Sequence, residues 1–213
     1  CREIPNGIHV NDGFLTDQEG KRFDVSAIGP LRGKHNWQNI AAAWAVARTY
    51  RIPSENIAAS LKTFSGLPHR LETVAKINNI GFVNDSKATN VEATSHALAL
   101  LNDIYWIAGG VTKEIQLAPA LPHLNHVRHA YLIGEAAAEI ALELEKIRIP
   151  VTHSGDLYTA LKEAHADAVV DDLSSPVVLL SPACASFDQF SNFEQRGDYF
   201  RRLVLSLAAG HET

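Results

Sequence analysis

Seven consecutive residues, 84–90, bring together side chains of the kinds that bind nucleotides and small anions. The run reads Asn-Asp-Ser-Lys-Ala-Thr-Asn. Asp85 could orient a metal-bound water or a ribose hydroxyl, and Lys87 could hold a phosphate or a carboxylate as a point charge. Thr89 could bind an anion. The alternative is a polar loop in which Thr89 or Asn90 only caps the next helix, and local composition leaves both interpretations open.

Two later segments also suit a small anionic ligand. Gly109-Gly110 would let the backbone approach a ligand closely, and Lys113 lies near the next predicted helix start, where free N–H groups favour anions. The alternative there is a flexible turn with a solvated lysine. Residues 181–188 are mostly small, so backbone groups and the Ser186 hydroxyl could face a ligand.

A nucleophile at Cys184 or Ser186 is a further interpretation, and Cys184 would make the chain a thiol hydrolase. No Gly-x-Ser-x-Gly motif and no particular histidine accompanies them, so a buried structural cysteine is favoured. Two other patterns are set aside. Gly29–His35 has three residues between its glycines where a phosphate loop has four. The histidines that recur every third residue over 123–129 have no acid or cysteine beside them.

Amide and guanidinium groups upstream could contact a nucleotide. Asn36 and Asn39 are three residues apart, so both amides can point the same way, and an amide suits the edge of adenine. The alternative is that Asn36 only caps a helix. Arg70 offers a fixed fork for a phosphate or ribose, or else forms a surface ion pair with Glu72.

Residues 1–66 are predicted to form short, turn-linked strands and two helices. Asn11-Asp12-Gly13 indicates a tight turn. One helix follows over Ile40–Ala47, and a second begins with Ser54 as its N-cap. Ser65-Gly66-Leu67-Pro68 breaks this pattern, so we place a domain boundary between residues 66 and 67.

Residues 67–213 alternate between apolar strands and amphipathic helices. This alternation predicts an α/β fold, a mostly parallel sheet covered by helices. Ligands of such folds bind where strands end and helices begin, which is where the segments above lie. The predicted strands are Gly81–Asn84, Ile104–Ala108, Ala130–Ile133, Ile149–Thr152 and Val177–Leu180, and the predicted helices lie around 137–144, 157–164 and 193–207.

Composition excludes several classes of protein. The 213 residues, 46% hydrophobic and 20% charged, suffice for one large or two modest domains and contain no run near the ~20 apolar residues of a membrane span. A net charge of −5 speaks against nucleic-acid binding. Two cysteines favour a reducing cytoplasm. The chain begins at Cys1 and contains no Met, so we expect it to be part of a longer protein.

The order of the motifs is more specific than any one of them, and it closely resembles that of the Mur ligase family, in particular its D-glutamate-adding members. The resemblance covers about residues 33–207. The motifs are Gly-Lys-His-Asn-x-x-Asn from residue 33, His-Arg-x-Glu from 69, Asn-Asp-Ser-Lys-Ala-Thr-Asn from 84, Gly-Gly-x-x-Lys from 109, and Leu-Ser-Pro-Ala-Cys-Ala-Ser-Phe-Asp-Gln-Phe from 180, continued by Asn-Phe-Glu-Gln-Arg-Gly from 192.

The resemblance implies that residues 1–66 end a central ATP-binding domain and that residues 67–213 form a C-terminal Rossmann-like domain. It implies a cytoplasmic ligase of peptidoglycan precursor synthesis. ATP, with Mg²⁺, phosphorylates the carboxylate of UDP-N-acetylmuramoyl-L-alanine, and the amine of D-glutamate then displaces the phosphate. These small molecules would be the partners of a monomer that binds no nucleic acid and no membrane.

The resemblance also assigns roles to residues. Lys87 and Asp85 would be catalytic, and no residue is assigned to a metal. ATP would be held by Asn36, Asn39, Arg70 and Asp85. The D-glutamate pocket would be formed by Thr89, Lys113, Ser186, Phe187 and Phe193.

The sequence departs from the family pattern in two places. Ile115 stands where glycines are expected after Lys113-Glu114, so this loop is expected to differ. The 213 residues also contain no Gly-x-x-x-x-Gly-Lys-Ser/Thr loop for ATP phosphates, so we expect no turnover from this chain alone. The alternatives are another Mur ligase, a folylpolyglutamate synthetase, or a non-catalytic amino-acid-binding module.

Overall fold

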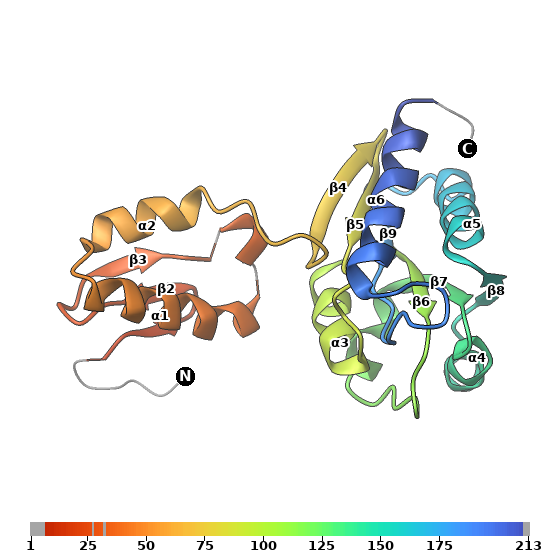
Figure 1. Cartoon of the computed structure of the whole chain (residues 1–213), viewed down its shortest axis with the longest axis horizontal. Coiled ribbons are helices and arrows are strands. Elements are labelled where there is room, and N and C mark those ends of the chain that lie inside the picture. The colour runs from red at the N-terminus through yellow and green to blue at the C-terminus, as the bar shows by residue number, and fades with distance from the viewer. Residues whose placement is uncertain (1–6, 27, 32, 211–213) are drawn as a thin grey trace. The chain divides into compact units, whose positions relative to one another are not determined.

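The computed structural model describes residues 7–26, 28–31 and 33–210, and the chain divides between Leu67 and Pro68 into two compact units (Figure 1). Gly66, next to the division, has a φ of 92°, which side chains other than glycine rarely adopt. The division lies one residue after the boundary predicted from the sequence. Each unit has its own core and is described by itself.

The first unit is a three-stranded antiparallel sheet with two helices. Val10, Leu15 and Trp44 are buried in its core. Asp12 and Gly13 have φ values of 47° and 79° and form the two-residue turn between the first two strands, which confirms the predicted turn. The elements are β1 (His9–Asn11), β2 (Phe14–Thr16), β3 (Arg22–Asp24), the short 3₁₀ helix η1 (Gly29–Leu31), α1 (Lys34–Thr49) and α2 (Ser54–Lys62).

Two side-chain caps considered for this unit are not formed: the predicted cap at Ser54 and the alternative role of Asn36 as a cap. Ser54 is the first residue of α2, whose N-cap is Pro53. The Ser54 hydroxyl donates instead to the buried carboxylate of Asp17, 2.7 Å away, so a tertiary contact replaces the local cap. Asn36 lies inside the first turn of α1, because the helix begins two residues earlier with Gly33 as N-cap. The side chain of Asn36 is therefore not the helix cap.

The second unit contains a six-stranded sheet with the order β4-β5-β9-β6-β7-β8. The last five strands of this order are parallel, as predicted, whereas β4 runs antiparallel to β5 at the edge. No strand was predicted at β4, since its half-exposed residues form no continuous apolar run. The strands are β4 (Glu72–Ile77), β5 (Ile80–Asn84), β6 (Ile104–Gly109), β7 (Val127–Ile133), β8 (Val151–Gly155) and β9 (Val177–Leu180).

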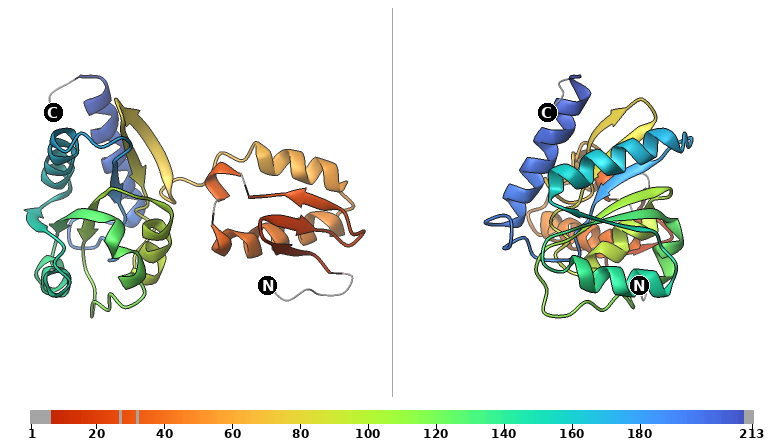
Figure 2. Two further views of the ribbon diagram at one scale, coloured as in Figure 1. Left: turned by 180° about the vertical axis from the view of Figure 1, so that it is seen from behind. Right: turned by 90° about the vertical axis from the view of Figure 1, so that its right-hand side faces the viewer.

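Helices cover both faces of this sheet (Figures 1 and 2). All six residues of β6 are buried, and they alternate between two cores: Trp106 faces the helices α3 and α4, and Tyr105 faces α5 and α6. The helices are α3 (Val91–Leu100), η2 (Leu121–His126), α4 (Ala137–Lys146), α5 (Leu157–Val170) and α6 (Phe193–Ala208). Among the described residues, no helix has the length and apolar character needed to cross a bilayer.

Candidate functional site

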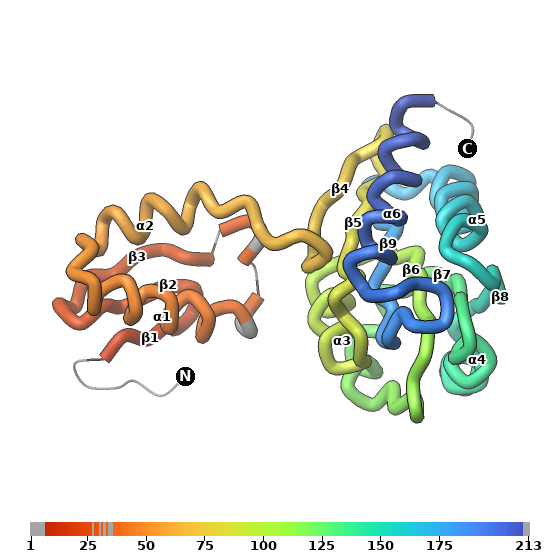
Figure 3. Tube along the Cα trace, viewed as in Figure 1, coloured from red at the N-terminus to blue at the C-terminus, as the bar shows by residue number. Residues whose placement is uncertain are grey.

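The predicted binding segments follow three strands that are neighbours in the sheet. Strand β9 lies between β5 and β6, and all three are parallel, so their carboxyl ends meet at one edge (Figure 3). Lys87 follows β5, Ser186 follows β9 and Lys113 follows β6. The strand order, which sequence distance does not suggest, brings these three loops together.

Asp85 is buried where β5 ends, and both of its carboxylate oxygens accept hydrogen bonds. The Ser181 hydroxyl donates to one oxygen at 2.8 Å, and the backbone N–H of Leu71 donates to the other at 3.1 Å. Burial raises the pKa of Asp85 to about 6, although the two hydrogen bonds and the positive charge of Arg70 pull it down. Asp85 therefore ties the chain after β5 to the start of the loop after β9.

Lys87 is exposed, and its ammonium lies 3.9 Å from the centroid of the Phe193 ring. This cation–π contact joins the loop after β5 to the first residue of α6. The backbone N–H of Lys87 donates to the His69 carbonyl at 3.0 Å, which fixes the lysine main chain. Two residues predicted at the site are therefore in direct contact.

The loops after β6 and β9 are joined by backbone pairing. Val111 and Ala185 exchange two N–H···O bonds of 2.8 and 2.9 Å. Lys113 comes two residues after the first partner, and Ser186 comes directly after the second. This pairing sets the relative position of the two segments.

Gly109 and Gly110 are predicted to let a ligand approach the backbone, and the structure adds a second reason for glycine at both positions. Their φ values are 127° and 131°. A Cβ added at Gly109 would lie 1.9 Å from the Ile133 carbonyl oxygen, and one added at Gly110 would lie 2.0 Å from that of Ala185. The glycines are needed because neighbouring backbone occupies the space a side chain would take.

Thr89 is exposed and lines a pocket of about 560 Å³. Asn90, not Thr89, caps α3, because its side chain accepts a hydrogen bond from the Ala93 N–H at 2.9 Å. The threonine hydroxyl is thus not needed for the cap. The pocket is lined by Thr89, Asn90, Val91, Glu92, Ala93 and His96 on one side and by Thr112, Glu114, Gln116, Pro119 and Ala183 on the other, so it adjoins the segment that contains Lys113.

The remaining residues predicted for the amino-acid pocket differ in exposure. Phe187 is 72% exposed, whereas Ser186 is only 2% exposed. The Ser186 hydroxyl is fully buried and has no hydrogen-bond partner. The hydroxyl is therefore covered by protein in this structure.

The residues predicted to contact ATP lie in different units. Asn36 and Asn39 share one face of α1 in the first unit, with 3.4 Å between the amide nitrogen of Asn39 and the amide oxygen of Asn36. Arg70 is exposed in the second unit. Its predicted surface pair with Glu72 is not the one observed, because Glu72 pairs with Arg201 at 2.6 Å.

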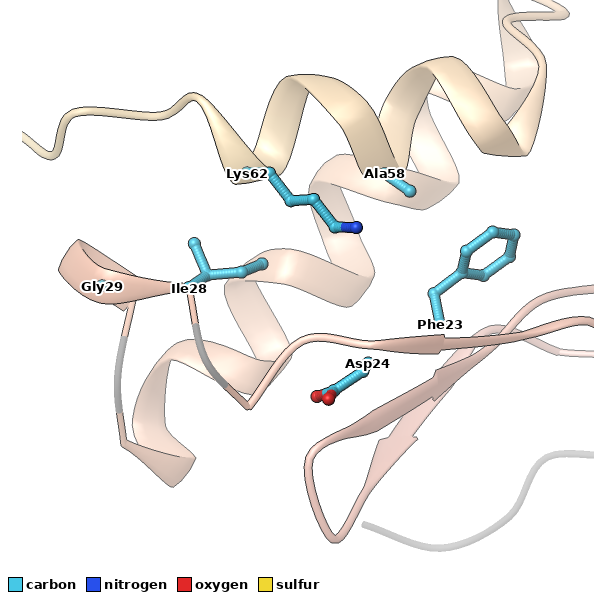
Figure 4. Close-up of a pocket in the computed structure, with 6 residues that line it drawn as sticks. All are labelled: Phe23, Asp24, Ile28, Gly29, Ala58 and Lys62. Atoms are coloured by element: carbon cyan, nitrogen blue, oxygen red, sulfur yellow. The ribbon is translucent and has the colours of Figure 1, made fainter.

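A second pocket, of about 450 Å³, lies within the first unit between β3, η1 and α2 (Figure 4). The Lys62 side chain extends into it from α2. None of the predicted site residues lines it. The lining residues are Phe23, Asp24, Ile28, Gly29, Ala58 and Lys62.

Two other interpretations of the sequence find no support in this geometry. Cys184 is fully buried, and burial raises the pKa of its thiol to about 12, so it is not the thiolate that a thiol hydrolase needs. One ring nitrogen of His126 bonds to the Leu98 carbonyl, and one of His129 bonds to the Thr152 hydroxyl. Within the described part of the chain, no three His, Cys, Asp or Glu side chains are grouped to hold a metal ion.

Arg196 is the main residue at this site that the sequence analysis missed. It is 1% exposed and donates hydrogen bonds to Ser86 and Cys184, which belong to two different loops. The signal was present in the sequence, since Arg196 lies three residues after Phe193 and four before Phe200, on the apolar stripe of α6. A charged residue on such a stripe indicates a buried polar role.

The fold and the site define an α/β protein that gathers lysines, hydroxyls and a buried carboxylate at the carboxyl edge of a parallel sheet. A family model described as "Mur ligase, glutamate ligase domain" matches residues 69–184. This match covers more than half of the chain, which therefore belongs to the Mur ligase family.

Individual relatives extend this similarity over nearly the whole chain. The chain is 46% identical over 212 residues to the UDP-N-acetylmuramoylalanine--D-glutamate ligase of Rhodospirillum rubrum, which covers 97% of this chain and 44% of that protein. The ligase of the same name from Phenylobacterium zucineum is 43% identical over 213 residues, 98% of this chain and 45% of that protein. The chain thus spans less than half the length of these relatives.

Solved structures share the fold at low sequence identity. The UDP-N-acetylmuramoylalanyl-D-glutamyl-2,6-diaminopimelate--D-alanyl-D-alanyl ligase of Acinetobacter baumannii matches with a TM-score of 0.60 at 18% identity, over 90% of this chain and 41% of that one. The Mycobacterium tuberculosis folylpolyglutamate synthase, complexed with ADP and AMPPCP, also has a TM-score of 0.60 at 18% identity, over 91% of this chain and 46% of that one. These matches establish the fold alone.

Proposed function

We propose that this chain contributes the D-glutamate-binding part of an ATP-dependent ligase that joins D-glutamate to UDP-N-acetylmuramoyl-L-alanine, a step of peptidoglycan precursor synthesis. The observation that carries the proposal is the 43–46% identity, over nearly all of the chain, to ligases named for this reaction. The reaction passes through an acyl phosphate that the amine of D-glutamate attacks. The protein acts as a monomer in the cytoplasm.

The charges at the sheet edge support a dicarboxylate as the ligand. Lys87 and Lys113 are both exposed and follow neighbouring strands, so their ammonium groups are available to two carboxylates. Thr89 adds an exposed hydroxyl beside the segment of Lys113. In this proposal Lys87 also faces the charge that develops on the acyl phosphate, while Phe193 holds the lysine in place.

Each unit contains residues that suit a part of ATP. The paired amides of Asn36 and Asn39 suit the edge of adenine, and Arg70 suits a phosphate or ribose. Asp85 is engaged with Ser181 and Leu71, so its part is to hold the loop beside the nucleotide. No three His, Cys, Asp or Glu side chains of the described residues are grouped to hold a metal ion, so an Mg²⁺ ion would be held largely by the phosphates of ATP.

A chimera tests the proposal directly. These 213 residues would replace the aligned 44% of the Rhodospirillum rubrum ligase, and ATP-dependent addition of D-glutamate to UDP-N-acetylmuramoyl-L-alanine would be measured. We expect activity with D-glutamate and none with L-glutamate, and Lys113→Ala should abolish it. A folded chimera that stays inactive beside an active parent enzyme contradicts the proposal. The 213-residue chain alone should consume no ATP.

The folylpolyglutamate synthetase alternative is not favoured. Its support is a shared fold at 12–19% identity, which carries no information about the substrate. In the chimera assay, it predicts that a folate and L-glutamate replace the two proposed substrates.

A further inference from the structure

A buried guanidinium connects the loops that carry the proposed amino-acid site. We propose that Arg196 is a positioning residue: from the first turn of α6 it clamps the loops after β5 and β9 and thereby fixes where Lys87 and Ser186 stand. The inference deepens the proposed function and rests on it for the identity of the ligand. The clamp itself is defined by contacts within this chain.

The contacts of Arg196 reach two loops at once. Its Nε donates to the Ser86 hydroxyl oxygen at 3.0 Å, and one terminal nitrogen, Nη2, donates to the Ser86 carbonyl at 3.0 Å and to the Cys184 carbonyl at 3.1 Å. The Ser86 hydroxyl in turn donates to the Phe193 carbonyl at 2.8 Å. Ser86, Cys184 and the first turn of α6 are therefore held by one planar group.

The clamp acts on the binding side chains through their immediate neighbours. Lys87 directly follows Ser86, and its ammonium rests over the ring of Phe193, whose carbonyl Ser86 holds. Ser186 follows Cys184 by two residues, and the residue between them is paired with Val111. A displacement of the guanidinium would therefore move the lysine and the serine relative to each other.

Stability alone is a poor reason for a charge at this position. Arg196 is 1% exposed, and it takes part in none of the ion pairs formed by the described residues. Burial lowers its pKa to about 10, and its second terminal nitrogen, Nη1, has no hydrogen-bond partner. Asp188 acts on the guanidinium electrostatically but forms no ion pair with it, and a buried cation without a directly bonded carboxylate costs free energy that an apolar side chain would not. What the guanidinium supplies, and an apolar residue cannot, is a rigid link between two carbonyls and a hydroxyl.

Gly110 marks how tightly the guanidinium is fitted. A Cβ added there would lie 3.2 Å from Nη1 of Arg196, in addition to its closer contact with the Ala185 carbonyl. The Ser186 hydroxyl is also buried without a partner. The backbone of the loop after β6 therefore packs closely against the guanidinium at Gly110.

The test compares Arg196→Lys and Arg196→Met with Arg201→Lys in the 213-residue chain. Arg201 lies on the same helix but bonds to Glu72 and Asp198, whereas Arg196 bonds to Ser86 and Cys184. Two signals are measured. The first is the NMR ring-current shift of the Lys87 side-chain methylenes, with Phe193→Leu as the unshifted reference. The second is the dissociation constant for D-glutamate from calorimetry, with thermal unfolding recorded for every variant.

We expect both Arg196 variants to lose the ring-current shift and to bind D-glutamate at least about 10-fold more weakly, a loss of roughly 1.4 kcal/mol. Arg201→Lys should alter the melting temperature but neither signal. The positioning role is refuted if Arg196→Lys keeps the shift. If Arg196→Met does not fold, Ser86→Ala removes the hydroxyl link alone and should reduce the shift.

The two proposals fail in different ways. If the unaltered chain does not bind D-glutamate, the proposed ligand is wrong, yet the ring-current shift still decides whether Arg196 positions Lys87. If D-glutamate binds and Arg196→Lys keeps the ring-current shift, the ligand assignment stands and the clamp is rejected.

Discussion

At the scale of single residues, Asp85 shows how burial changes the chemistry of a side chain. Its pKa is raised to about 6 from a usual value of 3.8, because burial disfavours the charged form more than its hydrogen bonds favour it. The folded protein therefore binds this proton more tightly than the unfolded chain does. The resulting contribution to stability is full below about pH 4 and is lost as the pH rises through 6.

The variant Asp85→Asn should remove this pH dependence. The interval from 3.8 to about 6 corresponds to about 3 kcal/mol, so the variant should gain about that much stability relative to the unaltered chain between pH 4 and pH 7. Urea unfolding at several pH values measures the difference. If the free energies of unfolding of Asp85→Asn and of the unaltered chain differed by the same amount at every pH in this range, Asp85 would not have the raised pKa.

Asp17 provides a control, because its pKa is shifted in the direction opposite to that of Asp85. Burial raises its pKa, but the Ser54 hydroxyl and the backbone N–H groups of Lys21 and Glu19 outweigh burial, so the net direction is downward. Its contribution is therefore present above its unfolded pKa and is lost on acidification. Asp17→Asn should lose stability relative to the unaltered chain as the pH rises from acid to neutral.

At the scale of elements, two adjacent side chains at the start of α3 have different roles: one is structural and the other is proposed to bind the ligand. Asn90 caps the helix through the Ala93 N–H, whereas the adjacent Thr89 is exposed beside the pocket. The sequence left open which of the two was the cap. The structure assigns that role to Asn90 and leaves the threonine hydroxyl free of it.

The pair Asn90→Ala and Thr89→Ala tests this division. Asn90→Ala should lower the free energy of unfolding by about 1 kcal/mol, because an N–H of the first turn loses its acceptor. Thr89→Ala should leave stability within about 0.5 kcal/mol and weaken D-glutamate binding. Chemical unfolding and calorimetry give the two readouts. Equal loss of stability in both variants would show that the threonine is structural.

Local sequence patterns predicted which segments form strands or helices better than they predicted the tertiary contacts of these segments. The buried strands β5, β6, β7 and β9 were predicted because continuous apolar runs suit strands covered on both faces. The edge strand β4 was missed, since one half-exposed strand carries no such run. Ser54 was assigned to a cap because local rules cannot anticipate a hydrogen bond to Asp17, 37 residues away.

At the scale of the whole molecule, the two units have separate cores. The buried apolar residues of the first unit lie between Val10 and Ile57. The two cores of the second unit, with their partly buried neighbours, are built from residues from Leu71 onward. Each unit therefore buries its own apolar surface, which is what independent folding requires.

Residues 68–213 should fold without the first unit. We expect this fragment to melt cooperatively and to keep the amide spectrum that its residues give in the whole chain, including the ring-current shift of Lys87. Calorimetry and NMR of the fragment measure both. A fragment without a cooperative transition would show that the second unit depends on the first.

From local pattern, most element types and a division of the chain one residue away from the observed one could be predicted, and candidate binding segments could be proposed. These follow from local periodicity, from turn residues and from motifs, all of which act over a few positions. The three-dimensional structure was needed to show that β9 lies between β5 and β6, that Gly109 and Gly110 lie against neighbouring backbone, and that Arg196 joins two loops. The reason is that such contacts depend on strand order and packing between residues far apart in the chain, and a local pattern contains neither.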